Sequence, residues 1–67
     1  KTLGSQLLER DFREAGVPMP IYAKRLGSHR TSVFRWISGR FRPAYPKILL
    51  MQRKLGIPAT AWEQPPK

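Results

Sequence analysis

Cysteine is absent from this chain, and histidine occurs once, at His29. Without cysteine the fold has neither a disulfide framework nor a thiolate zinc site, and one histidine does not build a metal site by itself. We therefore expect no metal and no other cofactor, and stability has to come from packing. A chain of 67 residues forms at most one small domain with little room for a catalytic cavity. The sequence predicts a protein that is not an enzyme.

Long apolar runs are also missing, because the longest covers only residues 48–51. A membrane-spanning helix needs about 20 apolar residues, and the apolar part of a secretory signal needs about 7 to 15. We expect a cytoplasmic protein without a membrane partner.

Acidic residues are scarce, with four Asp and Glu against 13 Lys and Arg, which gives a formal net charge of +9 at pH 7. Such a charge raises the local concentration of polyanions and steers them to the surface. Five arginines fall within residues 25–43 without one acid among them. Composition alone does not separate DNA, RNA and acidic lipid as the partner.

Strand patterns are missing as well, because β-branched residues nowhere alternate with polar ones, whereas leucines recur at helical spacing. We predict an all-α fold, a compact bundle of four to five helices divided by glycine and proline. The predicted domain spans residues 1–63, with helices over 5–15, 21–26, 30–38 and 45–55 and a further turn over 59–62. The proline-rich residues 64–67 are predicted to form a disordered tail.

Helical spacing predicts which side chains face the core. These residues are Leu8, Phe12, Ala15, Val33, Trp36, Ile37, Ile48, Leu49, Gln52 and Leu55. Leu50 falls outside this phase, and with Trp62 it is predicted to form a patch for a partner or a second copy. Ser5 is predicted to cap the first helix, and Pro20 to lie in the first turn of the second.

The turn between the second and third predicted helices consists of Gly27, Ser28 and His29 only. Ser28 or His29 is expected to cap the third helix. A connection this short makes two helices cross steeply, as in a helix-turn-helix, here over about residues 20–38.

From residue 16 to residue 63, about 48 of 67 residues, the chain resembles without a gap the helix-turn-helix family of phage Cro and repressor proteins and their bacterial xenobiotic-response-element (XRE) relatives. The residues that carry the resemblance are Gly16, Ala23, Leu26, Gly27, Arg30, Val33, Arg35, Trp36, Gly39, Arg42, Pro43, Leu49, Leu55 and Gly56. Together they are specific, whereas none of them is specific alone.

The resemblance implies a lambda-repressor-like domain whose third helix lies in the major groove of double-stranded DNA. The residues that it implies for base reading are Arg30, Thr31, Ser32, Phe34 and Arg35. The residues implied to contact phosphate are Lys24, His29, Arg40 and Arg42. It further implies a phage or bacterial transcriptional regulator, Cro-like or repressor-like, that acts in the bacterial cytosol or nucleoid as a weak homodimer on DNA.

Two departures from the family pattern lead to further expectations. Met19 stands where the family has a glutamine that bonds a phosphate, so Lys24 or the backbone N–H groups of the second helix are expected to replace that contact. Phe12 and Ile37 stand where many relatives have an ion pair. Two apolar groups often replace such a pair without loss of stability, which predicts a packing contact between them.

Other functions stay open at this point. The alternative is an antitoxin-type protein-interaction module with secondary DNA binding, whose interface would contain Phe34, Leu50 and Trp62. Structured RNA would use the charge equally well, although RNA-binding surfaces usually display several stacking aromatics. A basic membrane-surface helix over residues 47–54 is disfavoured, because its apolar face matches the core pattern of the family.

Overall fold

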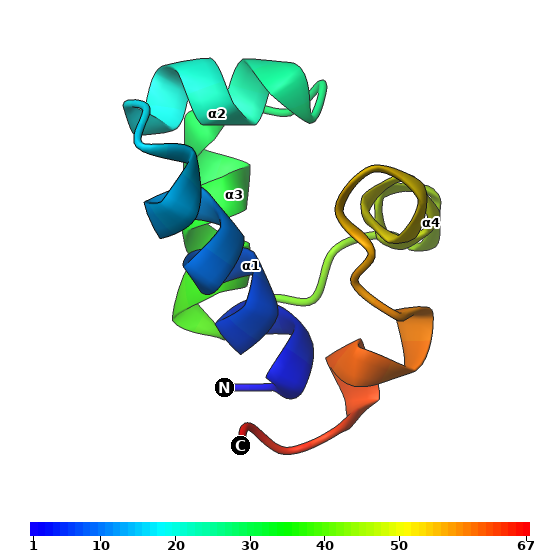
Figure 1. Cartoon of the computed structure of the whole chain (residues 1–67). Coiled ribbons are helices and arrows are strands. Elements are labelled where there is room, and N and C mark those ends of the chain that lie inside the picture. The colour runs from blue at the N-terminus through cyan, green and yellow to red at the C-terminus, as the bar shows by residue number, and fades with distance from the viewer.

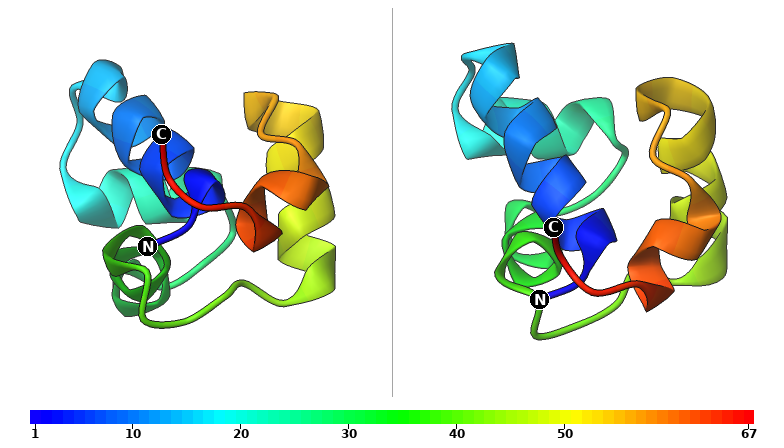
Figure 2. Two further views of the ribbon diagram at one scale, coloured as in Figure 1. Left: turned by 90° about the horizontal axis from the view of Figure 1, so that it is seen from below. Right: turned by 60° about the horizontal axis from the view of Figure 1, so that its bottom comes forward.

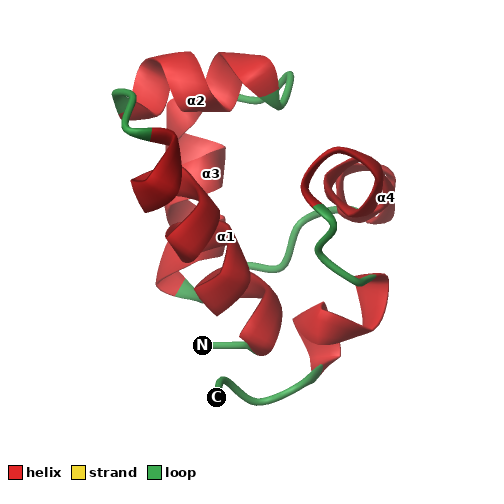
Figure 3. Ribbon diagram, viewed as in Figure 1, coloured by secondary structure: helices red, strands yellow, loops and turns green.

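The computed structural model describes all 67 residues and contains helices but no strands (Figure 3). In chain order the elements are α1 (Leu3–Ala15), α2 (Met19–Arg25), α3 (Arg30–Ser38), α4 (Tyr45–Leu55) and a 3-10 helix, η1 (Ala59–Glu63). The predicted all-α class is confirmed. The radius of gyration is 10.5 Å, close to the roughly 11 Å expected of one folded domain of this length. None of the helices combines the length and the apolar character that crossing a bilayer requires.

The helix α1 is central to the packing, because it contacts α2, α3 and η1 (Figure 1). α2 packs against α3, and α4 joins the rest through η1 and through its own core residues. The two chain ends lie close together beside α1 (Figure 2), where the Leu3 N–H donates to the Gln64 carbonyl at 2.8 Å. The buried core consists of Leu8, Tyr22, Ala23, Leu26, Val33, Trp36, Ile37, Ile48, Met51, Ile57, Ala61 and Trp62.

The start of α1 differs from the prediction, because Thr2 and not Ser5 is the N-cap. The Thr2 hydroxyl accepts the Ser5 N–H at 3.1 Å, and the Ser5 hydroxyl accepts the Thr2 N–H at 2.9 Å. This reciprocal pair is a capping box, in which Ser5 takes the place of the more usual glutamate or glutamine. The prediction of a Ser5 cap was wrong because two hydroxyl residues three positions apart are equally good candidates.

The Phe12 ring packs edge-on against Tyr22 of α2, with ring centroids 5.1 Å apart. Edge-to-face pairs at this separation are favourable beyond the area that they bury. Phe12 is partly buried against the core, as predicted. Its contact with Ile37 stays a prediction.

The buried face of α4 agrees with the prediction only in part, because Ile48 is buried and Leu55 is partly buried against the core. Ile48 and Met51 are buried, whereas Leu49 is 39% exposed and Gln52 is exposed. Leu50, predicted to lie outside, is partly buried against the core. The predictions for Leu49, Gln52 and Leu50 were wrong because four apolar residues in a row leave the phase of a helix open, and tertiary packing then decides it.

Trp62, predicted to lie on a partner surface, is a core residue with 1% of its surface exposed. Its indole lies against Gly4 of α1, where an added Cβ would come within 2.7 Å of Cε3 and 2.8 Å of Cε2. The missing side chain at Gly4 therefore makes room for the ring that docks η1 on α1. The predicted patch of Leu50 and Trp62 was wrong.

The last four residues contact α1. The Gln6 amide donates to the Lys67 carbonyl at 3.0 Å and accepts the Lys67 N–H at 2.8 Å. With the bond between Leu3 and Gln64, these contacts hold residues 64–67 along α1.

Candidate nucleic-acid interface

The turn between α2 and α3 is closed by the backbone. Gly27 has a φ of +64°, in the left-handed region that glycine enters without a Cβ penalty. The Ser28 N–H donates to the Ala23 carbonyl at 3.0 Å, and the Gly27 N–H donates to the Lys24 carbonyl at 3.0 Å. These two bonds form a Schellman motif. The direction in which the chain enters α3 is therefore set by hydrogen bonds within the turn.

Two lysines of α4 strengthen the same turn from outside. Lys47 Nζ donates to the Gly27 carbonyl at 2.7 Å and to the Leu26 carbonyl at 3.3 Å. Lys54 Nζ donates to the Arg25 carbonyl at 3.1 Å. The last carbonyls of a helix lack intrahelical partners and form the negative end of its dipole, so both ammonium groups are stabilising there. Sequence analysis missed this role, although a spacing of seven residues, about two turns, puts both lysines on one face of α4.

The N-cap of α3 is His29, which is one of the two residues expected to cap this helix. Its Nδ1 accepts the Thr31 N–H at 3.1 Å. A neutral imidazole that accepts at Nδ1 carries its proton on Nε2. Because His29 is exposed, this N–H is a donor on the surface at the start of α3.

The helix α3 has one buried and one exposed face. Val33, Trp36 and Ile37 are buried, as predicted, with 0%, 8% and 8% of their surfaces exposed. Ser32 is half-buried, and Phe34 is 63% exposed. The other predicted base-reading residues, all exposed, are Arg30, Thr31 and Arg35. The structure therefore places these five residues on one helix, four of them exposed.

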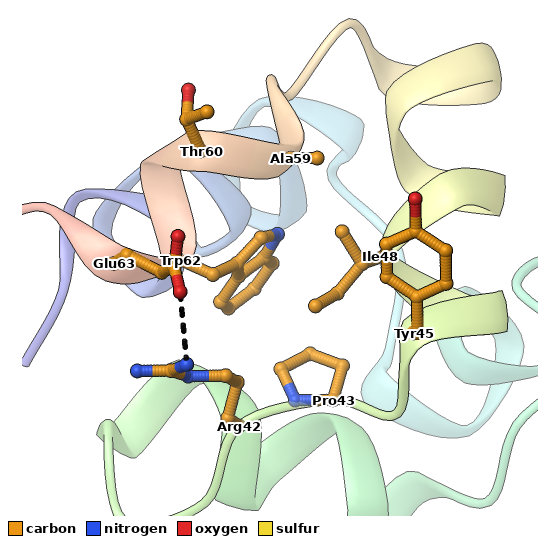
Figure 4. Close-up of a pocket in the computed structure, with 8 residues that line it drawn as sticks. All are labelled: Arg42, Pro43, Tyr45, Ile48, Ala59, Thr60, Trp62 and Glu63. Carbon is orange, nitrogen blue, oxygen red and sulfur yellow. Dashed lines mark ion pairs between the residues drawn. The ribbon is translucent and has the colours of Figure 1, made fainter.

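The predicted phosphate-contacting residues flank this surface. Lys24 lies on α2, His29 at the start of α3, and Arg40 and Arg42 in the loop after it. All four are exposed. Arg42 also has an acidic neighbour, because its Nη1 lies 3.6 Å from Oε1 of Glu63 (Figure 4). A polyanion that binds Arg42 would have to compete with Glu63 for its guanidinium.

The backbone at the start of α2 offers little to a phosphate. Pro18 is the N-cap, without a side-chain hydrogen bond. Pro20 has no N–H, and the Ile21 N–H donates to the Pro18 carbonyl at 3.1 Å. Met19 is left as the only one of the first three helical residues with an N–H for an anion. The expected replacement by α2 backbone groups is thus reduced to one donor, and Lys24 is the stronger candidate.

Phe41 is a residue that sequence analysis did not select. Its ring lies under the guanidinium of Arg35, with Cζ at 5.2 Å from the ring centroid, and it is 56% exposed. The available signal was an aromatic residue between Arg40 and Arg42 in a basic loop.

Three of the four acids lie on α1, and the fourth lies on η1 beside Arg42. The four acidic residues are Glu9, Asp11, Glu14 and Glu63. Residues 15–62 therefore contain no acid, and they carry nine of the 13 Lys and Arg residues. The charged residues of this region, which includes α2, α3, the loop after α3 and α4, are all basic.

A hollow of about 300 Å³ lies between the loop after α3, the start of α4 and η1 (Figure 4). Its wall includes Tyr45, Ile48 and Trp62, with Arg42 and Glu63 at one side. The indole N–H of Trp62 has no hydrogen-bond partner in the protein. Because this nitrogen is buried, an acceptor in the hollow does not reach it without a shift of the surrounding side chains.

No protein-family model matches the chain, and no curated protein or solved structure is similar enough to count as a match.

Proposed function

We propose that this chain is a sequence-specific transcriptional regulator that binds double-stranded DNA through a helix-turn-helix of lambda-repressor-like fold. The observation that carries the proposal is the division of α3 into a buried apolar face and an exposed face with Arg30 and Arg35. The backbone-closed turn at Gly27 supports it, because a reading helix has to be held at a defined angle to the helix before it.

The dimensions of α3 fit a major groove. With its side chains an α-helix is about 10 to 12 Å across, and a major groove about 12 Å wide admits it. The nine residues of α3 extend over roughly 13 Å along the helix axis. Arg30 and Arg35 offer planar guanidinium forks for O6 and N7 of guanine, and Phe34 offers a ring for a thymine methyl. His29 at the start of α3 and Arg40 beyond its end then lie where a groove is bordered by phosphates.

The charge distribution supports a polyanion as the partner. A basic region without acids over residues 15–62 provides the sequence-independent part of DNA binding, in which cations displace the counterions of the phosphates. Base contacts then add sequence preference. Two chains on half-sites about 34 Å apart are the expected arrangement on an operator.

The alternative, an antitoxin-type protein-interaction module, loses two of its three predicted interface residues. Trp62 is buried and Leu50 is partly buried, so Phe34 alone stays exposed. On α4, Leu49 is 39% exposed instead. An apolar surface of this kind favours a protein partner or a second copy as an addition to DNA binding.

Selection from a randomised duplex library, followed by titration of the selected duplex, a scrambled duplex and an RNA of equal length, tests the proposal. We expect one preferred duplex, bound at least a hundredfold more tightly than the other two at 0.15 M salt, with two chains per site at saturation. Equal binding of all three nucleic acids would leave only a non-specific basic protein. Preference for the RNA would favour a structured-RNA-binding protein.

A further inference from the structure

We propose that Phe41 is a positioning residue for Arg35, whose guanidinium it holds in place for one base pair. The inference deepens the proposed DNA-binding function and rests on it. It assigns part of the sequence preference to a side chain outside the reading helix.

The geometry is that of a cation above an aromatic ring. Cζ of Arg35 lies 5.2 Å from the centroid of the Phe41 ring, within the roughly 6 Å over which such pairs attract. Phe41 is 56% exposed. A residue exposed to this extent contributes little to core packing, so its contact with Arg35 is its clearest interaction.

The ring itself stands on a loop that is held on both sides. Gly39 ends α3 with a φ of +81°, and the Arg40 N–H donates to the Ser38 hydroxyl at 3.4 Å. On the other side Pro43 is buried. Phe41 therefore lies between two anchored points, and its ring is a defined support for the side chain above it.

Holding the guanidinium affects recognition for two reasons. An arginine in solution samples many rotamers, and an arginine held before binding loses less of this freedom when it meets a base. A guanidinium has five N–H donors, and its contact with one ring leaves donors available for O6 and N7 of guanine. Arg30 has no such ring beneath it in the structure. The effect of Phe41 should therefore appear at the base pair read by Arg35 and not at the one read by Arg30.

The test uses the selected duplex and a variant duplex changed at the base pair whose preference Arg35→Ala relaxes. Phe41→Leu keeps an apolar side chain but removes the ring face, and Phe41→Tyr keeps the face. Tyr45→Leu is the matched control, because it removes a ring that is 66% exposed and has no cation above it. Affinities for both duplexes are measured for each variant, and for Phe41→Leu in the Arg35→Ala background.

We expect Phe41→Leu to lower discrimination between the two duplexes about two- to fivefold, the equivalent of an exposed cation–π pair. Phe41→Tyr and Tyr45→Leu should retain it, and Phe41→Leu should have no further effect on discrimination once Arg35 is alanine. In the protein without DNA, the Nε–Hε proton signal of Arg35 should lie upfield and move downfield in Phe41→Leu, because the ring current is lost.

The opposite results are equally specific. If Phe41→Leu weakens both duplexes alike, or lowers discrimination in the Arg35→Ala background, the ring contacts DNA itself and the inference is overturned. An unchanged Arg35 signal in Phe41→Leu overturns it as well. If no preferred duplex is found, the proposed function fails and the inference fails with it, whereas a preferred duplex with full discrimination in Phe41→Leu overturns the inference alone.

Discussion

The Tyr22 hydroxyl donates a 2.6 Å hydrogen bond to the carboxylate of Asp11 and so joins α2 to α1. Tyr22 is buried, with 3% of its surface exposed, while Asp11 is half-buried. Burial raises the pKa of Tyr22 far above its ordinary value, and the bond to Asp11 and the charge of Asp11 raise it further. The bond holds in place the helix from which the turn to α3 begins.

Tyr22→Phe should lower the free energy of unfolding by about 1 kcal/mol, because it removes this bond and leaves a partly buried carboxylate without its donor. The ring and its contact with Phe12 are retained. Urea denaturation measures the change. Tyr45→Phe removes an exposed hydroxyl that makes no hydrogen bond in the structure and should stay within about 0.5 kcal/mol of the wild type. Equal stability of all three proteins would contradict the role of the bond.

The same tyrosine predicts a loss of stability at alkaline pH. An unfolded tyrosine ionises near pH 10, whereas the pKa of Tyr22 is raised in the fold. Above pH about 10 the unfolded state therefore binds fewer protons than the folded state, and the free energy of unfolding falls by up to about 1.4 kcal/mol per pH unit. The stabilisation is complete below pH 10 and declines above it. Tyr22→Phe should show a shallower decline in urea titrations from pH 9 to pH 11, and identical declines would refute the assignment.

Gly4→Ala should destabilise the fold by about 1 to 3 kcal/mol, since the new Cβ would overlap the Trp62 indole and both groups are enclosed. Gly4 is helical, so the substitution would otherwise favour α1. Arg10→Ala, at an exposed position of the same helix, is the control and should change stability by about 0.5 kcal/mol or less. Thermal or urea unfolding distinguishes the two. A stabilised Gly4→Ala protein would mean that Trp62 does not lie against α1.

Lys47→Met should destabilise the protein by about 1 kcal/mol, because the ammonium donors to the Leu26 and Gly27 carbonyls are lost while the aliphatic part of the side chain is kept. Arg53→Met is the control on the same helix, since Arg53 is exposed and makes no hydrogen bond in the structure. Hydrogen exchange of the Gly27 and Ser28 amides should accelerate in Lys47→Met only. Unchanged protection there would show that the lysine does not hold the turn.

The arginines of the proposed interface should divide into two groups. Arg30→Ala and Arg35→Ala should each make the free energy of binding to the preferred duplex less favourable by about 1 to 3 kcal/mol. Each should also weaken the sequence preference at one base pair. Arg40→Ala and Arg42→Ala should weaken all duplexes about equally and lower the slope of log K against log salt by about 1. A salt series on matched and scrambled duplexes measures both effects.

Glu63→Gln serves as the counterpart to Arg42→Ala in that series. It removes the acid that pairs with Arg42 at 3.6 Å, so it should strengthen binding to every duplex alike. If Arg30→Ala and Arg35→Ala weakened both duplexes equally, base reading by α3 would have to be abandoned.

The sequence predicted helix bounds best where a single residue ends the helix. The structure gives α3 and α4 the predicted bounds, because Gly39 and Gly56 take positive φ values of 81° and 72° and end a helix wherever it packs. The buried face of α4 was predicted correctly for Ile48 and Leu55 but not for Leu49 and Gln52, because the phase of the helix depends on where it packs. Trp62 was predicted to be exposed for a related reason. The space that its indole occupies exists because Gly4, in a distant part of the chain, has no side chain.

In the candidate interface, too, local spacing was predicted and contacts between different segments of the chain were not. The exposed side of α3 was predicted because Val33, Trp36 and Ile37 define the opposite side by their spacing. The support of Arg35 by Phe41 and of the turn by Lys47 was not predicted. The first contact joins α3 to the loop that follows it, and the second joins α4 to the turn before α3.

The confinement of all four acids to α1 and η1 makes the molecule an electric dipole as well as a cation. α1 has three acids and two arginines, and it covers the inner side of α3. In the field of a rod-shaped polyanion such a body experiences a torque in addition to attraction. It would rotate before contact so that α3 leads, and fewer collisions would arrive with the wrong side forward. Added salt should weaken this alignment within a Debye length of about 10 Å at 0.1 M.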